Sequence, residues 1–189
     1  MAKLTSYTFL SLNGYYKGLN EDISWHRHGE EEAEFSAHSL QAGNMLLFGR
    51  VTYELMEAFW PTEEAMHLYP IVAEGMNRAE KIVFSRTLEK ADWDHARVVN
   101  TDMITEIRRL KQGTKDMTLL GSGDVLRQLA EHDLLDEYLF MIDPVAITDG
   151  VSVFTGMKSM LHLNLVSNRV LKSGTVLLTY HPVTPEGKL

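Results

Sequence analysis

MLLFGRVTYELM at residues 45–56 and MTLLGSGDVLRQL at residues 117–129 share one pattern. Each opens with a short, largely apolar run, reaches a glycine and continues with apolar residues at helical spacing. An apolar run without alternation is typical of a strand that is covered on both faces, as in a parallel sheet. Two such strands that pass through glycine directly into a helix predict an α/β protein with a largely parallel sheet.

The rest of the chain extends this alternation and becomes strand-rich near the C-terminus. Residues 172–174 (Lys-Ser-Gly) predict a hairpin turn, so the last strands must be antiparallel. Without a repeat or a linker, we expect a single domain over residues 1–189, with a mixed, mostly parallel sheet between helices. The expected helices are 30–43, 52–59, 64–76, 101–110 (with Thr101 as N-cap) and 124–131, and the expected strands are 3–12, 45–48, 81–84, 97–99, 117–120, 138–147, 161–171 and 176–180.

Composition excludes several classes of protein. The 189 residues contain no cysteine, which excludes disulfides, cysteine nucleophiles and thiolate zinc sites. The formal net charge of -8 disfavours non-specific binding to nucleic acid or to an anionic membrane surface. The N-terminal residues lack a secretory apolar core, and no apolar run approaches the ~18 residues of a membrane span, so we expect a cytoplasmic protein.

Three junctions that follow predicted strands combine small residues with hydroxyl or cationic side chains. Ligands of open α/β sheets bind outside the carboxyl ends of parallel strands, where helix N-termini present free N–H groups. Glycine lets a ligand approach the backbone and arginine adds positive charge, so we expect a phosphate-containing ligand. At each junction taken singly, a plain turn or a solvated arginine is the alternative. The residues are Gly49, Arg50 and Thr52, then Ser85 and Arg86, then Gly121, Ser122 and Gly123.

Other familiar motifs do not occur. Leu126 stands where a Rossmann fingerprint needs its third small residue, and the chain has neither a Gly-Lys-Ser/Thr phosphate loop nor a Gly-x-Ser-x-Gly elbow. His26 and His28 flank Arg27 at a spacing that is poor for a metal site on one helix face. We expect a surface loop there and no metal ion.

Five segments, in this order, carry a family resemblance: SLNGYYKGLNEDISW (11–25), LLFGRVTYELM (46–56), KIVFSRTL (81–88), MTLLGSGDVLRQL (117–129) and DEYLFMIDPVAI (136–147). They resemble the dihydrofolate-reductase-like fold and, more closely, the RibD C-terminal reductase family of riboflavin biosynthesis in its free-standing bacterial form. The resemblance spans nearly the whole sequence and implies a three-layer αβα arrangement. The pair FGRVTYE and GSGDVLRQL at this separation is its most specific part.

The resemblance also implies NADPH as the cofactor. By this likeness Gly49, Arg50 and Thr52 grip cofactor phosphate, and Ser85 and Arg86 lie by the adenosine side. Gly121, Ser122 and Gly123 pass under the nicotinamide and the pyrophosphate. These are the same three junctions that the strand ends indicate.

The likeness further makes residues 13–25 a mobile segment that closes over the nicotinamide, with Trp25 at its end and with Tyr15 and Tyr16 able to cover an apolar ring. An ordinary surface connection with buried aromatic residues is the alternative. Relatives commonly have aspartate where this sequence has Asn13. Glu30, five residues after the tryptophan, matches a carboxylate that orients substrate in folate enzymes, although an acidic helix start also complements the helix dipole.

We therefore expect an NADPH-dependent reductase of a small heterocyclic or carbonyl substrate, similar to the 5-amino-6-(5-phosphoribosylamino)uracil and dihydrofolate reductases. The alternative is a non-catalytic module that binds NADP(H) or another nucleotide. No attached deaminase is expected, because zinc deaminases need cysteines. Family members pair as homodimers, and we expect one here, with few helices left to cover an apolar face that includes Leu139, Met141, Val166, Val170, Leu177 and Leu178.

Overall fold

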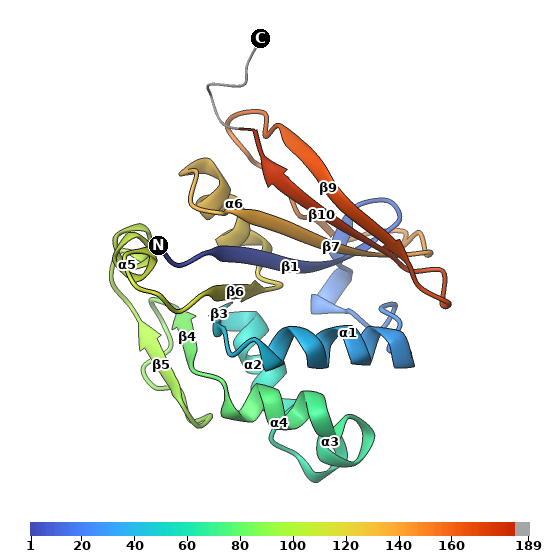
Figure 1. The fold of residues 1–189 in the computed structure, drawn as a ribbon, viewed down its shortest axis with the longest axis horizontal. Helices are drawn as coiled ribbons and strands as arrows, with labels where there is room; N and C mark the ends of the chain where they lie inside the picture. Colours follow the sequence, from blue (N-terminus) through green and yellow to red (C-terminus); the bar gives the residue numbers. More distant parts are fainter. Residues whose placement is uncertain (184–189) are drawn as a thin grey trace.

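The computed structural model describes residues 1–183, and its central feature is one eight-stranded sheet (Figure 1). In sequence order the strands are β1 (Leu4–Ser11), β3 (Met45–Gly49), β4 (Lys81–Phe84), β5 (Ala96–Val99), β6 (Met117–Leu120), β7 (Glu137–Asp143), β9 (Leu163–Val170) and β10 (Val176–Pro182). Across the sheet they lie in the order β5-β4-β3-β6-β1-β7-β10-β9. Neighbours from β5 to β7 pair in parallel, and β10 pairs antiparallel with β7 and β9.

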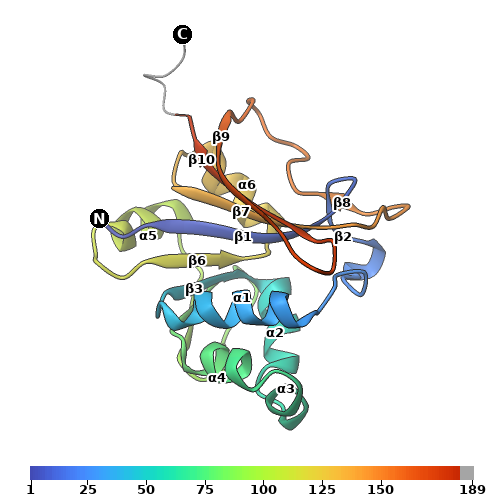
Figure 2. The same ribbon diagram turned by 45° about the vertical axis from the view of Figure 1, so that its right-hand side comes forward.

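Helices cover both faces of the sheet (Figures 1 and 2). The helices α5 (Met103–Lys111) and α6 (Gly123–Glu131) pack on one face. The helices α1 (Glu30–Gln41), α2 (Arg50–Phe59) and α4 (Pro70–Arg78) pack on the other, and the short α3 (Glu63–Leu68) precedes α4. The mixed α/β sheet, the three layers and the C-terminal antiparallel hairpin confirm the expected fold class.

The strand β3 shows why the apolar run at its position predicts a covered strand. Leu46 and Phe48 belong to the core under α1 and α4, whereas Leu47, between them, belongs to the core under α5 and α6. All three are at most 2% exposed. A strand with helices on both faces needs apolar residues at every position, and burying each such side chain contributes about 2 kcal/mol.

Several element boundaries differ from the sequence-based expectation. The predicted helix 64–76 is two helices, α3 and α4, because Pro70 has no N–H to continue α3 and instead occupies the first turn of α4. The N-cap of α5 is Asp102, whose carboxylate accepts the Thr105 N–H, and not Thr101. The predicted strand 138–147 ends at Asp143, directly before Pro144.

The segment 15–25 is not the structureless loop that its lack of periodicity indicated. Its first residues form β2 (Tyr15–Lys17), which pairs with β8 (Val151–Ser152) in a separate two-stranded sheet, and a 3-10 turn η1 (Leu19–Glu21) follows. The pairing joins residues more than a hundred positions apart, which no local pattern reveals.

The expected uncovered apolar face at the C-terminal strands is smaller than predicted. Met141 and Leu177 are buried against Tyr7 and Leu171 within the molecule. In the C-terminal strands, the exposed large apolar side chains lie on the edge strand β9 and are Leu165, Val166 and Val170. Among residues 1–183, no helix combines the length and the apolar character that crossing a membrane requires.

Candidate functional site

The carboxyl ends of β3, β6 and β1 open into a cavity of about 730 Å³ that α1, α2, α4 and the start of α6 enclose. Two groups of lining residues lie in different parts of it. We call Gly49, Arg50, Thr52, Gly121, Ser122 and Gly123 the glycine end, and we call Phe9, His26, His28 and Glu32 the histidine end. Two of the three predicted junctions therefore meet in one cavity.

Hydrogen bonds of Ser122 hold the glycine end together. Its hydroxyl oxygen accepts the Gly49 N–H at 2.8 Å and lies 3.0 Å from the Thr52 hydroxyl oxygen. These bonds join the turn before α2 to the turn before α6, so the N-termini of both helices reach the same cavity. Free N–H groups and positive dipole ends at such termini favour a negatively charged ligand.

The turn into α6 needs a special backbone conformation. Gly121 and Ser122 both have positive φ, 53° and 56°, a region that glycine enters without strain. Gly123 has a different reason for being glycine, because a Cβ there would lie 2.6 Å from the ring of Tyr16. Tyr16 of β2 thus lies directly against the start of α6 and lines the cavity.

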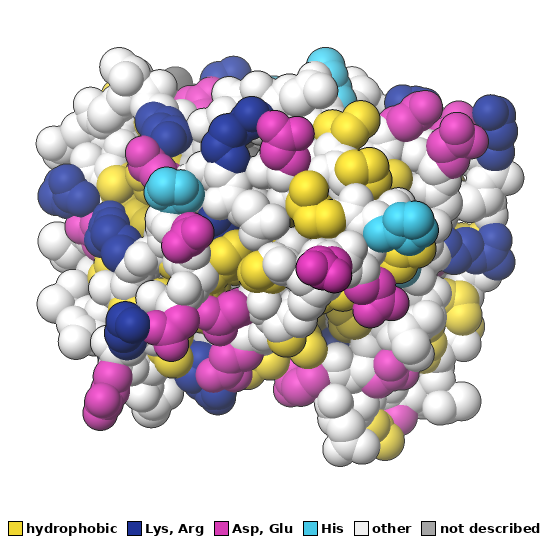
Figure 3. Space-filling view, turned by 90° about the horizontal axis from the view of Figure 1, so that it is seen from below, with side chains coloured by type: hydrophobic (Ala, Val, Ile, Leu, Met, Phe, Trp, Pro, Cys, Tyr) yellow, Lys and Arg dark blue, Asp and Glu magenta, His cyan; other side chains and the backbone are white. Residues whose placement is uncertain are grey.

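Arg50 brings a positive charge to the glycine end. Its guanidinium pairs with Glu54 one turn later on α2 at 2.8 Å, and both side chains are 44% exposed. Such an exposed pair is weak, so Arg50 is free to turn toward an anion. On the face shown in Figure 3, Asp and Glu side chains are spread among the apolar ones, in keeping with the net charge of -8.

The third predicted junction does not reach this cavity. Neither Ser85 nor Arg86 is among the lining residues, although Phe84 at the end of β4 is. The Ser85 hydroxyl accepts the N–H groups of Thr87 and Leu88, so it closes a turn after β4. Arg86 is exposed.

Of the three predicted lid aromatic residues, all of them half-buried, one lines the cavity. Tyr16 lines the cavity, whereas Tyr15 and Trp25 do not. The Trp25 indole N–H donates to the Asp22 carbonyl at 3.2 Å. Asn13 lies outside the lining as well, and its side chain bonds both the N–H and the carbonyl of Ile147. Its role here is to join two loops.

Glu30 does not occupy the position that the family resemblance implies. It is exposed at the start of α1 and outside the cavity lining, whereas Glu32 is 4% exposed and lines the cavity. Residues two positions apart on an α-helix point about 200° apart, so Glu30 and Glu32 lie on different sides of α1, and the role that the resemblance gives Glu30 stays a prediction. The Glu32 carboxylate accepts a hydrogen bond from the Ser173 hydroxyl.

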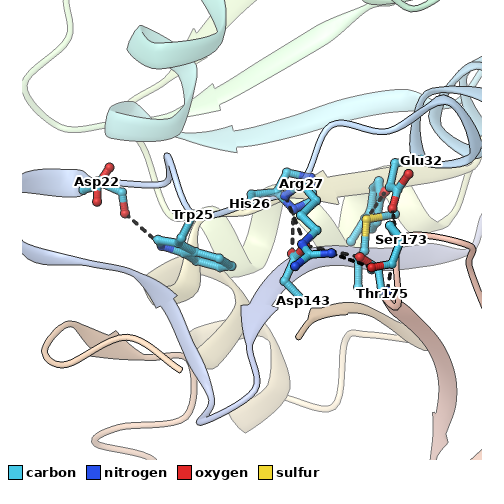
Figure 4. Close-up of polar contacts among 10 residues, drawn as sticks. Asp22, Trp25, His26, Arg27, Glu32, Asp143, Ser173 and Thr175 are labelled. Atoms are coloured by element: carbon cyan, nitrogen blue, oxygen red, sulfur yellow. Dashed lines mark hydrogen bonds and ion pairs between the residues drawn. The ribbon is translucent and has the colours of Figure 1, made fainter. Parts of the chain in front are cut away.

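At the histidine end His26 contacts a buried carboxylate, Asp143, and the sequence did not indicate this contact. His26 Nδ1 lies 2.7 Å from Asp143 Oδ2, and the two side chains are 2% and 0% exposed (Figure 4). Asp143 also accepts the Arg27 N–H at 3.1 Å and the Thr175 hydroxyl at 3.3 Å. The expected surface loop at residues 26–28 is therefore wrong for His26. The available signal was an aspartate inside a predicted apolar strand.

The strand β1 connects the two ends of the cavity. The Gly121 N–H donates to the Tyr7 carbonyl at 3.0 Å, and the Phe9 ring stacks on the His26 ring with centroids 3.7 Å apart. Two residues along a strand span only ~7 Å. Thr8, between them, lines the cavity, and its buried hydroxyl has no hydrogen-bond partner within residues 1–183. Sequence reasoning did not select Thr8 either.

No group of three or more potential metal-ligating side chains gathers anywhere in residues 1–183. The cavity instead offers main-chain N–H groups at one end and ionisable side chains at the other.

Comparison with known proteins places this arrangement in a family. Residues 2–177 match the RibD C-terminal domain. The chain belongs to the RibD C-terminal domain family. The match ends inside β10, so it includes both ends of the cavity and the hairpin turn that contacts Glu32.

The relatives of this RibD C-terminal domain include proteins of similar length. It is 27% identical over 173 residues to the uncharacterized protein YyaP of Bacillus subtilis strain 168, covering 91% of this chain and 90% of YyaP. It superposes on RibD of Acinetobacter baumannii with a TM-score of 0.71 at 12% identity, covering 97% of this chain and 58% of RibD. A dihydrofolate reductase of Enterococcus faecalis, complexed with NADP(H) and RAB-propyl, superposes with a TM-score of 0.66 at 15% identity, covering 96% and 97%. These two structural matches show a shared fold.

Proposed function

We propose that this RibD C-terminal domain protein is a reductase that transfers a hydride from NADPH to a small heterocyclic or carbonyl substrate. The observation that carries the proposal is the single cavity in which a backbone-built anion site meets a cluster of ionisable side chains beside β1. The family membership and the E. faecalis neighbour, which is a complex with NADP(H), support the same reaction class.

The glycine end has the features that the phosphates of a dinucleotide need. Helix N-termini from α2 and α6 converge there through Ser122, and the Arg50 guanidinium stands beside them. Glycine at position 121 lets this turn lie close to α2, since a Cβ there would be 3.3 Å from the Thr52 side chain.

When bound, NADPH supplies the hydride. The protein itself has three tasks: to hold the phosphates at the glycine end, to place the acceptor carbon near Thr8, and to exclude water. Tyr16 performs the last task, because its ring lies over the start of α6. We include Tyr15 and Trp25 in the same lid, on the hypothesis that the segment 13–25 moves when the cofactor binds.

Calorimetric titration with NADPH and NADH tests the cofactor assignment. Arg50→Ala should weaken NADPH binding about tenfold, because a charge-assisted bond to phosphate is worth ~1.5–3 kcal/mol, and the fold should stay intact. Arg78→Ala is the matched control, since Arg78 also pairs with a glutamate one turn away, Glu74 at 3.6 Å, on α4. Equal affinities for NADPH and NADH, or equal effects of the two variants, would contradict the assignment.

Turnover separates the reductase from a non-catalytic nucleotide-binding module. NADPH oxidation should be followed by the loss of the absorbance band of reduced nicotinamide, with pterin, phosphoribosyl or ribityl pyrimidine and quinone acceptors. Tight NADPH binding without oxidation by any acceptor would favour the module.

We also infer that the protein forms a homodimer through the exposed apolar residues of β9, because an edge strand with Leu165, Val166 and Val170 exposed favours pairing with a second copy. Light scattering that gives a concentration-independent monomer would contradict this inference.

A further inference from the structure

Reduction of a carbonyl or imine group needs a proton as well as a hydride. When the hydride adds to carbon, the π electrons move to the neighbouring oxygen or nitrogen, which then takes up a proton. Several ionisable side chains line the cavity, and their surroundings differ. Burial raises the pKa of Tyr7, which makes it a weak acid, and Glu32 is engaged by Ser173.

His26 is the cavity-lining ionisable group that faces a buried carboxylate. Its Nδ1 lies 2.7 Å from Oδ2 of Asp143, whose side chain is 0% exposed. A buried carboxylate needs hydrogen-bond donors or a cation, and His26 Nδ1 stands where one of these donors is needed. Partial burial lowers the pKa of the neighbouring His28, and the charge of His26 lowers it further.

The second nitrogen of His26 is available to a ligand. Within residues 1–183 Asp143 is the hydrogen-bond partner of the ring, through Nδ1, which leaves Nε2 without one. The ring lines the cavity, and Phe9 and His28 hold its orientation, with ring centroids 3.7 and 4.6 Å from that of His26. Phe9 is two residues along β1 from Tyr7, whose carbonyl accepts the Gly121 N–H, so His26 lies in the same cavity as the glycine end.

We propose that His26 is the catalytic acid of this protein and that Asp143 is the positioning residue that keeps it charged and oriented. The proposal rests on the proposed reductase function. The hydride of NADPH adds to the carbon of a C=O or C=N group, and the π electron pair moves to the oxygen or nitrogen. The proton on His26 Nε2 passes to that atom. The substrate thus gains a hydride from NADPH and a proton from His26, and NADPH becomes NADP⁺. Neutral His26 then regains a proton from water.

The proposal defines a substrate class. The substrate carries a C=O or C=N group, either within a ring or outside one, whose heteroatom accepts a hydrogen bond from Nε2, and the product is an alcohol or an amine. A substrate whose reduced bond is C=C, with no basic atom at that position, is not expected to use His26.

His26→Asn is the decisive variant. The asparagine amide can keep the hydrogen bond to Asp143 in place of Nδ1, whereas nothing replaces the Nε2 proton. We expect kcat to fall about 100-fold or more, the range that general acid catalysis contributes, with NADPH affinity within about twofold of the wild type. His38→Asn on the exposed side of α1 is the control and should change neither. The assay uses NADPH with the acceptor from the pterin, pyrimidine and quinone panel that the wild type reduces fastest.

The pH profile separates catalysis from a structural role. The wild-type kcat should fall as the pH rises and His26 loses its proton, and this dependence should be missing from His26→Asn. A merely structural histidine would change stability and leave the profile of the remaining activity unaltered. The ionisable groups in contact with the His26 ring are Asp143 of β7 and His28 of its own segment. Glu32 of α1 and Tyr7 of β1 line the same cavity, and Arg27 follows His26 directly in the chain.

A spectroscopic test does not depend on turnover. In the NADPH complex at pH ~7, near the ordinary range of histidine, ¹⁵N NMR should show both nitrogens of His26 protonated, and Asp143→Asn should convert the ring to its neutral form. A neutral ring in the wild type overturns the proposal, because Nε2 then has no proton to give. If the wild type oxidises NADPH and His26→Asn is equally active, only the catalytic acid is wrong. If the wild type reduces no acceptor, the proposed function fails first.

Discussion

The glycine end and the histidine end of one cavity are built in opposite ways. The glycine end consists of short contiguous segments, 49–52 and 121–123, and presents main-chain N–H groups. The histidine end consists of side chains from distant positions, and its central contact joins His26 to Asp143 across 117 positions. A site made of backbone is determined by local conformation, whereas a site made of side chains exists only after the strands and loops have packed.

The ends also differ in what holds them. Ser122 joins two turns through neutral hydrogen bonds, each worth about 1 kcal/mol. The histidine end depends on the buried carboxylate of Asp143, which faces His26 Nδ1 and accepts from the Arg27 N–H and the Thr175 hydroxyl. Removing a buried acceptor leaves its donors unsatisfied, so the two ends should respond very differently to single substitutions.

The largest expected effect is that of Asp143→Ala. It leaves the three groups that face Asp143, namely His26 Nδ1, the Arg27 N–H and the Thr175 hydroxyl, without their acceptor, and each unsatisfied donor costs about 1–3 kcal/mol, so the free energy of unfolding should fall by about 3–5 kcal/mol. Urea unfolding measures the loss. Asp92→Ala is the control, because Asp92 pairs with Lys90 on the surface, with side chains 72% and 80% exposed, and should change stability by less than about 0.5 kcal/mol. Equal losses would mean that the histidine end is not a buried charge site.

A smaller effect is expected for Gly123→Ala at the glycine end. The new Cβ would meet the Tyr16 ring at 2.6 Å, so Tyr16 must move away from α6, at a cost of about 1–3 kcal/mol. NADPH binding should weaken with it, as measured by calorimetry. The double variant with Gly123→Ala and Tyr16→Ala removes the clash. Its loss in free energy of unfolding should therefore be smaller than the sum of the two single losses. Simple additivity would show that Tyr16 does not lie against this turn.

The smallest effect is a change of stability with pH at the histidine end. The lowered pKa of His28 means that the unfolded protein takes up this proton first as the pH falls. The contribution of neutral His28 to the free energy of unfolding is therefore complete above the ordinary histidine pKa of 6.5. It is lost as the pH drops below that value. Between pH ~7.5 and ~5, the urea unfolding midpoint should depend less on pH in His28→Gln than in the wild type. The exposed His38→Gln should keep the wild-type dependence. An unchanged slope in His28→Gln would remove His28 from this part of the site.

The predicted site residues Glu30, Ser85 and Arg86 do not line the cavity, although the elements that carry or precede them are where the sequence predicts them. Glu30 was selected by counting from Trp25, and a shift of two residues along α1 separates this exposed carboxylate from the buried Glu32. Ser85 and Arg86 follow a true strand end, and the Ser85 hydroxyl closes the turn on itself. The roles that the resemblance gives these residues stay predictions.

The sequence by itself determined the alternation of strands and helices, the two glycine turns and the family, because periodicity, apolar runs and glycine act within a few residues. The tertiary structure alone decided that the turns at Gly49 and Gly121 share a cavity, that Tyr16 of β2 lies over it, and that His26 pairs with Asp143. These contacts depend on the order of strands in the sheet and on which face each side chain takes. Such long-range pairing leaves no periodic signal in the sequence, since one residue of offset moves a side chain to the other face.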